Sequence, residues 1–292
     1  MTASIPGLRF GEFQGLPALL VQTPFSRAAI SLFGGHVLSW IPNGFDDVLW
    51  LSPVSKRPPD PIRGGIPVCW PYFARQGQPP DAPMHGLVRT LQWQVTHAQQ
   101  NADGEIVLAL SPPEVDDVPL TLLLTMRIGR ALEQALTTVN LGRETVRFTQ
   151  ALHTYFRVAD AERVAVSGLD GLRFADKFDD FNEHTQRGDW DLHDARDPGR
   201  CDRIYADTQG RFDLVDPVGS RRVTLTTSGS RSLVVWNPGA EWIKTFADLP
   251  PDGWKHYVCL EAANCGADVV ELATDDSHVL QQTITCAPLT NH

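Results

Sequence analysis

Apolar and polar residues alternate in many short segments along the whole chain. In the segment 121–128, Leu122, Leu124, Met126 and Ile128 occupy every second position, which places them on one face of a β-strand. Similar alternation or short apolar runs recur in the segments 105–110, 146–158, 222–227, 233–236, 256–262 and 278–286. The pattern predicts a protein built from many short strands.

Turn-forming pairs such as Asp103-Gly104 and Asp252-Gly253 separate the predicted strands. Helical periodicity is scarce. The segment 241–249 predicts one short helix, which Pro250 ends because proline cannot continue a helical hydrogen-bond pattern. We therefore expect an all-β chain, a large antiparallel β-sandwich of two sheets packed face to face, forming one domain over residues 1–292.

The charge balance argues against a nucleic-acid partner. The chain has 25 basic and 35 acidic side chains, a formal net charge of −10, whereas nucleic-acid affinity comes largely from lysine and arginine on phosphates. A small anionic ligand stays possible, because salt screens surface charge beyond about 8 Å.

The cysteine pattern and the hydropathy bear on the compartment. Five cysteines without a C-x-x-C pair favour free thiols. The N-terminus does not resemble a signal peptide, and no apolar stretch approaches about 20 residues. We expect a soluble, cytoplasmic protein that acts as a monomer, with no membrane partner.

One irregular segment, 63–93, gathers chemistry-bearing residues among glycines and prolines. It contains Arg63, Arg75, Arg89 and His85. A guanidinium group binds a carboxylate or phosphate through two parallel hydrogen bonds. The alternative is that each arginine forms a structural ion pair with an acidic side chain, which is common and contributes little.

A second candidate is His153, in the segment 150–158. Alternation places His153, Tyr155 and Arg157 on one face of a strand. These polar side chains indicate either the floor of a wet cleft or an exposed sheet surface.

A third candidate is Glu261, which shares a strand face with Tyr257 and Cys259. Burying a lone carboxyl group is costly. Either Glu261 has a structural partner, or its surroundings raise its pKa towards a value useful for proton transfer.

Two further positions fit a sugar site as well as a structural role. Asp202 stands at a predicted strand entrance, where aspartate is usually a turn residue. Trp236 lies in a predicted strand, where tryptophan is usually part of the core, although an aromatic ring beside a cleft can stack on a sugar.

The nine histidines show no zinc-binding spacing, and no nucleotide-binding or serine-hydrolase motif is found. We expect no metal and no cofactor.

Six segments together resemble the glucose-6-phosphate 1-epimerase branch of the aldose 1-epimerase (mutarotase) superfamily. They occur in the same order as in that family and span most of the chain: Ile62–Pro71, His85–Arg89, Leu152–Phe156, Asp202–Tyr205, Val235–Pro238 and Val258–Glu261. The resemblance implies a β-supersandwich that interconverts the α and β anomers of a hexose 6-phosphate without a cofactor.

The resemblance also implies roles for individual residues. His153 is the general acid and Glu261 the general base, Arg63 and Arg89 bind the phosphate or sugar, Asp202 holds sugar hydroxyls, and His85 is the other active-site histidine. The chain departs from many relatives at Met84, where they carry glutamine and where methionine cannot donate a hydrogen bond. Two alternatives stay open: a noncatalytic carbohydrate-binding or regulatory protein, and a mutarotase for unphosphorylated sugars. No role follows for the acidic segment 178–197.

Overall fold

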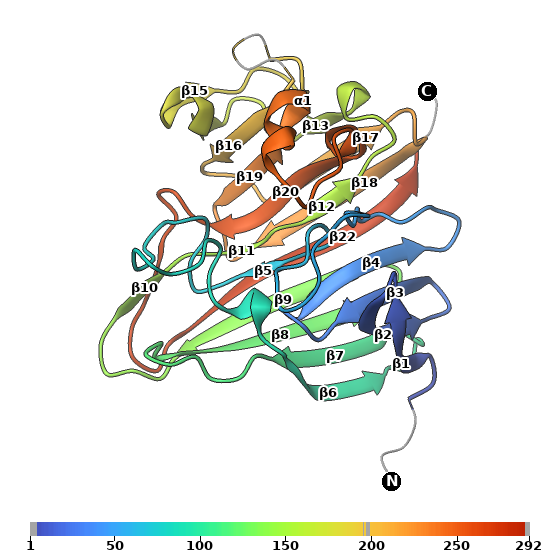
Figure 1. Cartoon of the computed structure of the whole chain (residues 1–292), viewed down its shortest axis with the longest axis vertical. Coiled ribbons are helices and arrows are strands. Elements are labelled where there is room, and N and C mark those ends of the chain that lie inside the picture. The colour runs from blue at the N-terminus through green and yellow to red at the C-terminus, as the bar shows by residue number, and fades with distance from the viewer. Residues whose placement is uncertain (1–4, 195, 197–198, 290–292) are drawn as a thin grey trace.

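The computed structural model describes residues 5–194, 196 and 199–289, and most of its regular structure is antiparallel β-sheet (Figure 1). The expected all-β class is confirmed. One eight-stranded sheet has the order β13 (Ala165–Ser167), β17 (Arg211–Asp216), β18 (Arg221–Ser228), β22 (Ser277–Pro288), β9 (Leu132–Asn140), β8 (Leu120–Ile128), β7 (Ile106–Ser111) and β6 (Gln94–Gln100).

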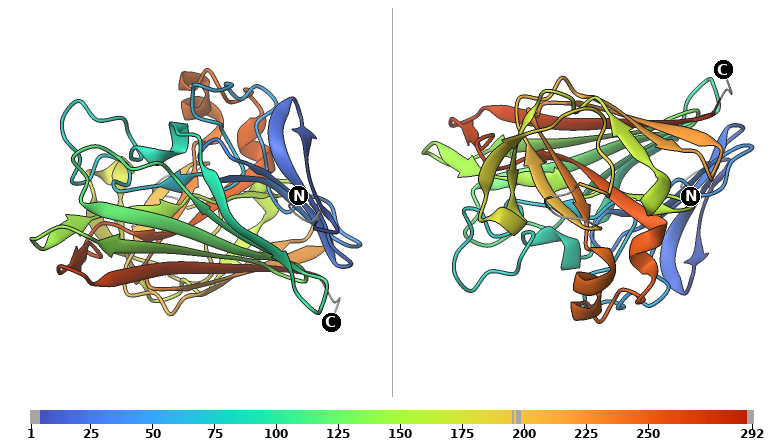
Figure 2. Two further views of the ribbon diagram at one scale, coloured as in Figure 1. Left: turned by 90° about the horizontal axis from the view of Figure 1, so that it is seen from below. Right: turned by 90° about the horizontal axis from the view of Figure 1, so that it is seen from above.

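The second eight-stranded sheet carries the candidate site. Its order is β15 (Asn182–Thr185), β14 (Arg173–Asp176), β16 (Cys201–Tyr205), β19 (Ser232–Asn237), β20 (Tyr257–Asn264), β11 (Gln150–Leu152) and β5 (Val68–Cys69), with β12 (Tyr155–Arg157) also paired to β20. The two sheets lie against each other (Figure 2). Hydrogen bonds connect the two layers within the core: Trp70 Nε1 donates to the Thr138 hydroxyl oxygen, and the Thr154 hydroxyl donates to Oε1 of Gln282.

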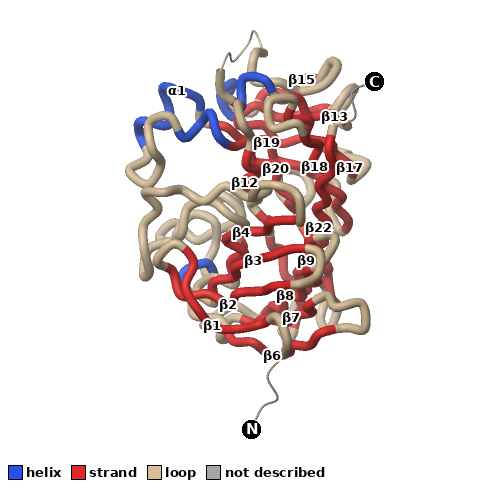
Figure 3. Tube along the Cα trace, turned by 90° about the vertical axis from the view of Figure 1, so that its right-hand side faces the viewer, coloured by secondary structure: helices blue, strands red, loops and turns tan. Residues whose placement is uncertain are grey.

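A smaller sheet and a short ribbon complete the strands. The four-stranded sheet contains β1 (Leu8–Phe13), β2 (Leu16–Gln22), β3 (Ser26–Ser31) and β4 (His36–Pro42), and β10 (Val146–Phe148) pairs with β21 (Val270–Leu272). The helical segments are short: η1 (Val88–Thr90), η2 (Ala161–Arg163), η3 (Lys177–Asp179), α1 (Gly239–Trp242), η4 (Ile243–Thr245) and η5 (Gly253–His256). Figure 3 shows α1 and its neighbouring turns gathered at one end of the sandwich. None of the helices in the described part of the chain has the length and apolarity needed to span a membrane.

Burial follows the alternating sequence pattern along β8 and β9 of the first sheet and departs from it along β19 and β20 of the second. Along β8 and β9 buried residues alternate with more exposed ones, as the period of a half-buried strand requires. All residues of β19 and β20 are buried, because other parts of the protein cover both faces of these strands. Polar side chains in β20 are therefore enclosed and need partners.

Two expectations about local structure need correction. The segment predicted as one strand at 146–158 is divided into β10, β11 and β12. The predicted helix at 241–249 begins earlier, at Gly239, and its helical turns end at Thr245. The remaining residues of that segment lead into the Pro250-Pro251 turn, where the chain can no longer form helical hydrogen bonds.

Gly64 is required by the close approach of two backbone segments beside the site. Its φ is +98°, and a Cβ atom there would lie 2.4 Å from the Trp50 carbonyl oxygen. Gly44, with φ +85°, has open space around the same position. We expect Gly44→Ala to lower the free energy of unfolding by about 1 kcal/mol from backbone strain alone. Gly64→Ala should cost about 2 kcal/mol more, since backbone must also move. Urea denaturation measures both; equal losses would contradict the steric explanation.

Candidate active site

A cavity of about 920 Å³ opens over the second sheet, a volume typical of small-molecule sites. All seven residues singled out from the sequence line it: Arg63, His85, Arg89, His153, Asp202, Trp236 and Glu261. They come from distant parts of the chain, and the fold brings them to one cavity.

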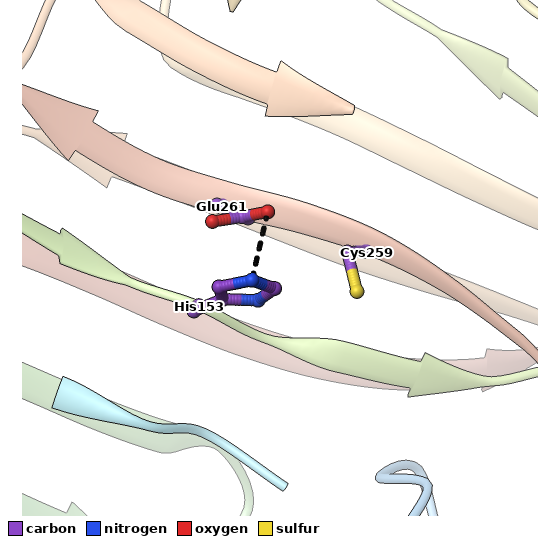
Figure 4. Close-up of side chains that lie close together, drawn as sticks. All are labelled: His153, Cys259 and Glu261. Carbon is purple, nitrogen blue, oxygen red and sulfur yellow. Dashed lines mark ion pairs between the residues drawn. The ribbon is translucent and has the colours of Figure 1, made fainter. Parts of the chain in front are cut away.

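His153 and Glu261 face each other across two paired strands (Figure 4). Both β11 and β12 pair with β20, at Leu152 opposite Ala262 and at Tyr155 opposite Cys259. His153 lies in the break between β11 and β12 and thus stands beside Glu261. Its Nε2 is 3.4 Å from Oε1 of Glu261, and the two residues are 8% and 1% exposed.

The surroundings disfavour charge on either member of this pair. Burial raises the pKa of Glu261 well above its ordinary value, and the Asp202 carboxylate adds to the effect. Burial lowers the pKa of His153 well below its ordinary value, and Arg63 and Arg89 lower it further. Both shifts favour the uncharged form of the pair, in which the proton is on the carboxyl group, while the cavity is empty.

Cys259 lies on the same face of β20, and its sulfur is within 4.8 Å of ligand atoms of His153 and Glu261. The spacing is compatible with a metal ion. In the metal-free protein, burial raises the pKa of Cys259 well above its ordinary value and favours the neutral thiol, so metal binding here would have to release the thiol proton. We assign no metal ligand among these residues.

Aromatic rings fix the orientation of the His153 imidazole. The Tyr155 ring stacks on it at 4.8 Å with an interplanar angle of 7°, and Trp236 meets it edge-on at 6.1 Å. Tyr155 thus shares the face predicted for His153. Arg157 holds the next alternate position of β12. Neither Tyr155 nor Arg157 lines the cavity, and Nε of Arg157 donates to the Leu49 carbonyl oxygen.

His85 sits at the edge of the pair, its ring 5.4 Å from that of His153. Its backbone φ is +68°, and its Nδ1 accepts a hydrogen bond from the Ala74 amide. Burial lowers its pKa well below the ordinary value, so the imidazole is neutral and carries its proton on Nε2. His85 is thereby set up as a hydrogen-bond donor.

Arg63 and Arg89 differ in the hydrogen-bond and ion-pair partners that the protein provides for their guanidinium groups. Arg63 donates from Nε to Asp248 at 3.0 Å and from Nη1 to the Tyr155 hydroxyl at 3.2 Å. Arg63 therefore forms the ion pair with an acidic side chain that the sequence left open as an alternative. Its other guanidinium hydrogens stay available. Arg89 donates to the Met84 carbonyl oxygen at 2.9 Å, and within residues 5–194, 196 and 199–289 no carboxylate forms an ion pair with it.

Asp202 is in β16, within a strand rather than at a turn, and its Oδ2 lies 2.9 Å from Nζ of Lys177. Lys177 and Asp248 were not foreseen from the sequence, because each contacts a site residue that is distant along the chain.

Met84 lines the cavity and is 41% exposed. Part of the acidic segment 178–197, whose residues 195 and 197 fall outside the described residues, reaches the cavity through Phe181 and Glu183.

The fold and the site together indicate a class of protein. A large antiparallel sandwich with an imidazole–carboxyl pair on a cavity floor has the form of a galactose mutarotase-like protein. A crystal structure with that description from Clostridium acetobutylicum superposes with a TM-score of 0.70 at 14% identity, covering 97% of this chain and 98% of the other, which shows the fold alone.

Sequence comparison gives the family. Residues 17–285 match the aldose 1-epimerase family. A protein of Escherichia coli K12, provisionally named glucose-6-phosphate 1-epimerase, is 35% identical over 270 residues, covering 88% of this chain and 86% of that protein. A crystal structure provisionally described as a mutarotase, from Salmonella typhimurium, has a TM-score of 0.88 at 30% identity, covering 99% and 96% of the two chains. The chain belongs to the aldose 1-epimerase family and is an isomerase of sugars.

Proposed function

We propose that this protein interconverts the α and β anomers of a hexose 6-phosphate, with glucose 6-phosphate as the expected substrate. The observation that carries the proposal is the convergence of His153 and Glu261, 3.4 Å apart, in a cavity that Arg63 and Arg89 also line. The provisional names of the relatives favour the same substrate.

Anomerisation needs two proton movements. Glu261 removes the proton of the C1 hydroxyl while His153 protonates the ring oxygen, and the C1–O5 bond opens to an aldehyde. Rotation about C1–C2 presents the other carbonyl face, and ring closure reverses both transfers. The pair starts and ends with one proton, so each turnover restores the site.

Arg63 and Arg89 would both bind the phosphate and set the electrostatic surroundings of His153. A phosphate on C6 is remote from the bond that breaks, so binding it orients the ring without opposing the reaction. In the empty site, the positive charges of Arg63 and Arg89 lower the pKa of His153. The bound phosphate dianion offsets these charges and so raises the pKa of His153 again. Binding thereby favours transfer of the shared proton from Glu261 to His153, the arrangement in which they act as base and acid.

One observation favours a mutarotase for unphosphorylated sugars as the second candidate. Arg63 already pairs with Asp248, so of these two arginines only Arg89 has no carboxylate ion pair among the described residues. A noncatalytic carbohydrate-binding protein has less support, because binding alone does not require a buried acid–base pair, and burying such groups is costly.

The direct test is the optical relaxation of freshly dissolved α-glucose 6-phosphate. We expect the protein to accelerate the approach to the anomeric equilibrium in proportion to its concentration. Relaxation at the buffer rate would overturn the proposal, and acceleration with free glucose alone would favour the second candidate.

The pH dependence of turnover follows from the two pKa shifts. Because the pKa of His153 is lowered, the doubly protonated pair forms only below the ordinary histidine value of about 6.5. Because the pKa of Glu261 is raised, the pair loses its last proton only above the ordinary glutamate value of about 4.3. We expect kcat with glucose, which lacks a titrating phosphate, to show its acidic limb below the ordinary histidine pKa and its alkaline limb above the ordinary glutamate pKa. An acidic limb at the ordinary histidine pKa would contradict the assignment.

A further inference from the structure

Lys177 enters the cavity from the segment that follows β14. It begins η3, lines the cavity, and places Nζ 2.9 Å from Oδ2 of Asp202. The Asp202 side chain is 13% exposed, whereas that of Lys177 is 45% exposed. The ammonium group therefore sits at the solvent side of the one carboxylate that the family resemblance links to sugar hydroxyls.

The backbone of Lys177 is tied to the strand that carries Asp202. The carboxylate of Asp176 accepts hydrogen bonds from the Phe178 amide at 3.0 Å and from Nε of Arg203 at 3.1 Å. Arg203 is 1% exposed and neighbours Asp202 in β16, paired in register with Asp176. This anchoring fixes where the Lys177 side chain starts.

An aromatic wall limits where the Lys177 side chain can go. Its Nζ lies 5.4 Å from the ring centre of Trp242, a cation–π contact. Trp242 in turn meets Trp236 at 6.5 Å and Phe178 at 4.9 Å. The ammonium group is thus directed at Asp202 from a defined position rather than from a free surface chain.

The charges around Glu261 show why a cation is needed here. Asp202 raises the pKa of Glu261 and Lys177 lowers it. Burial lowers the pKa values of His85 and His153 and raises those of Tyr155 and of the Cys69, Cys259 and Cys265 thiols around Glu261, which favours the uncharged form of each. The cavity lining also contains the charged side chains of Arg173, Glu183, Asp207, Arg231 and Asp268. Arg63 and Arg89 face His153 from the other loops, and Arg63 is partly offset by Asp248.

We propose that Lys177 is a positioning residue of the active site: its ammonium group orients the Asp202 carboxylate for the sugar hydroxyls and offsets its negative charge beside Glu261. The inference rests on the proposed function but is independent of the phosphate. Lys177 acts on the sugar ring through Asp202, so its loss affects phosphorylated and free sugar alike.

The test is a double-mutant cycle with anomer exchange of both glucose and glucose 6-phosphate. Lys177→Met removes the charge and keeps the length, Lys177→Arg keeps the charge, and Lys244→Met is the control, because Lys244 forms an exposed ion pair with Glu241. We expect Lys177→Met to lower kcat/KM about tenfold for both sugars, the loss typical of one charged hydrogen bond, Lys177→Arg to recover most of it, and the control to match the wild type.

Two readouts separate positioning from a structural role. In the Asp202→Asn background, Lys177→Met should change the rate by less than about twofold, since its target is already neutral. In the Asp202-containing protein, Lys177→Met should move the alkaline limb of kcat to higher pH, because the Asp202 carboxylate then acts on Glu261 without the opposing charge of the Lys177 ammonium group.

Three results would overturn the inference. They are a full Lys177→Met defect in the Asp202→Asn background, a defect confined to glucose 6-phosphate, and wild-type rates for Lys177→Met. Each presupposes an active wild-type enzyme. Absence of exchange in the wild type would instead refute the proposed function.

Discussion

Glu261→Gln is expected to lower catalysed anomer exchange on the order of 10² to 10⁴-fold, the contribution typical of a positioned general base. Glutamine keeps the size of the side chain but cannot take up a proton. Burial raises the pKa of Glu261 well above its ordinary value and so favours the uncharged carboxyl group, which the uncharged glutamine side chain resembles. We therefore expect the circular dichroism spectrum and thermal midpoint to stay close to those of the wild type.

Saturation-transfer NMR on the two anomeric protons measures this effect. Glu183→Gln is the matched control, because Glu183 lines the same cavity but forms an exposed ion pair with Arg173. The control should keep the wild-type exchange rate. A folded Glu261→Gln protein with near-normal exchange would remove Glu261 from the chemistry.

Arg89→Ala is expected to lower kcat/KM for glucose 6-phosphate about 10 to 100-fold, the loss typical of charged hydrogen bonds to a phosphate. Its effect on free glucose should be small. Arg89 lowers the pKa of His153, so its removal makes His153 easier to protonate and does not oppose turnover of a sugar without phosphate.

The control for this prediction is Arg231→Ala. Arg231 also lines the cavity, but it is exposed and paired with Asp207. Kinetics with both sugars distinguish the outcomes: equal losses for glucose and glucose 6-phosphate in Arg89→Ala would show that Arg89 does not act through the phosphate.

The class of fold and the members of the site could be predicted because both depend on local patterns. Alternation along 257–261 placed Glu261 and Cys259 on one strand face, and alternation around His153 placed Tyr155 beside it. The motif order of the family then linked these segments. The structure brings them together through the pairing of β11 and β12 with β20, which no periodicity reveals.

What could not be predicted depends on contacts between distant segments. Arg157 lies outside the cavity lining, although it alternates with Tyr155 in β12, and its guanidinium group donates to the Leu49 carbonyl oxygen. Asp248 pairs with Arg63 across 185 positions of sequence, and Lys177 reaches Asp202 from η3, after the neighbouring strand β14. Charge-bearing residues of this kind resemble ordinary surface positions until the sheet order is known.

The most direct test of the central claim is to compare anomer exchange of glucose 6-phosphate and of glucose by saturation-transfer NMR, with the wild-type protein at equal sugar concentrations. The account predicts a larger kcat/KM for glucose 6-phosphate, and predicts that Glu261→Gln lowers catalysed exchange of both sugars on the order of 10² to 10⁴-fold. Equal or greater efficiency with glucose, or no catalysed exchange of either sugar, would contradict it.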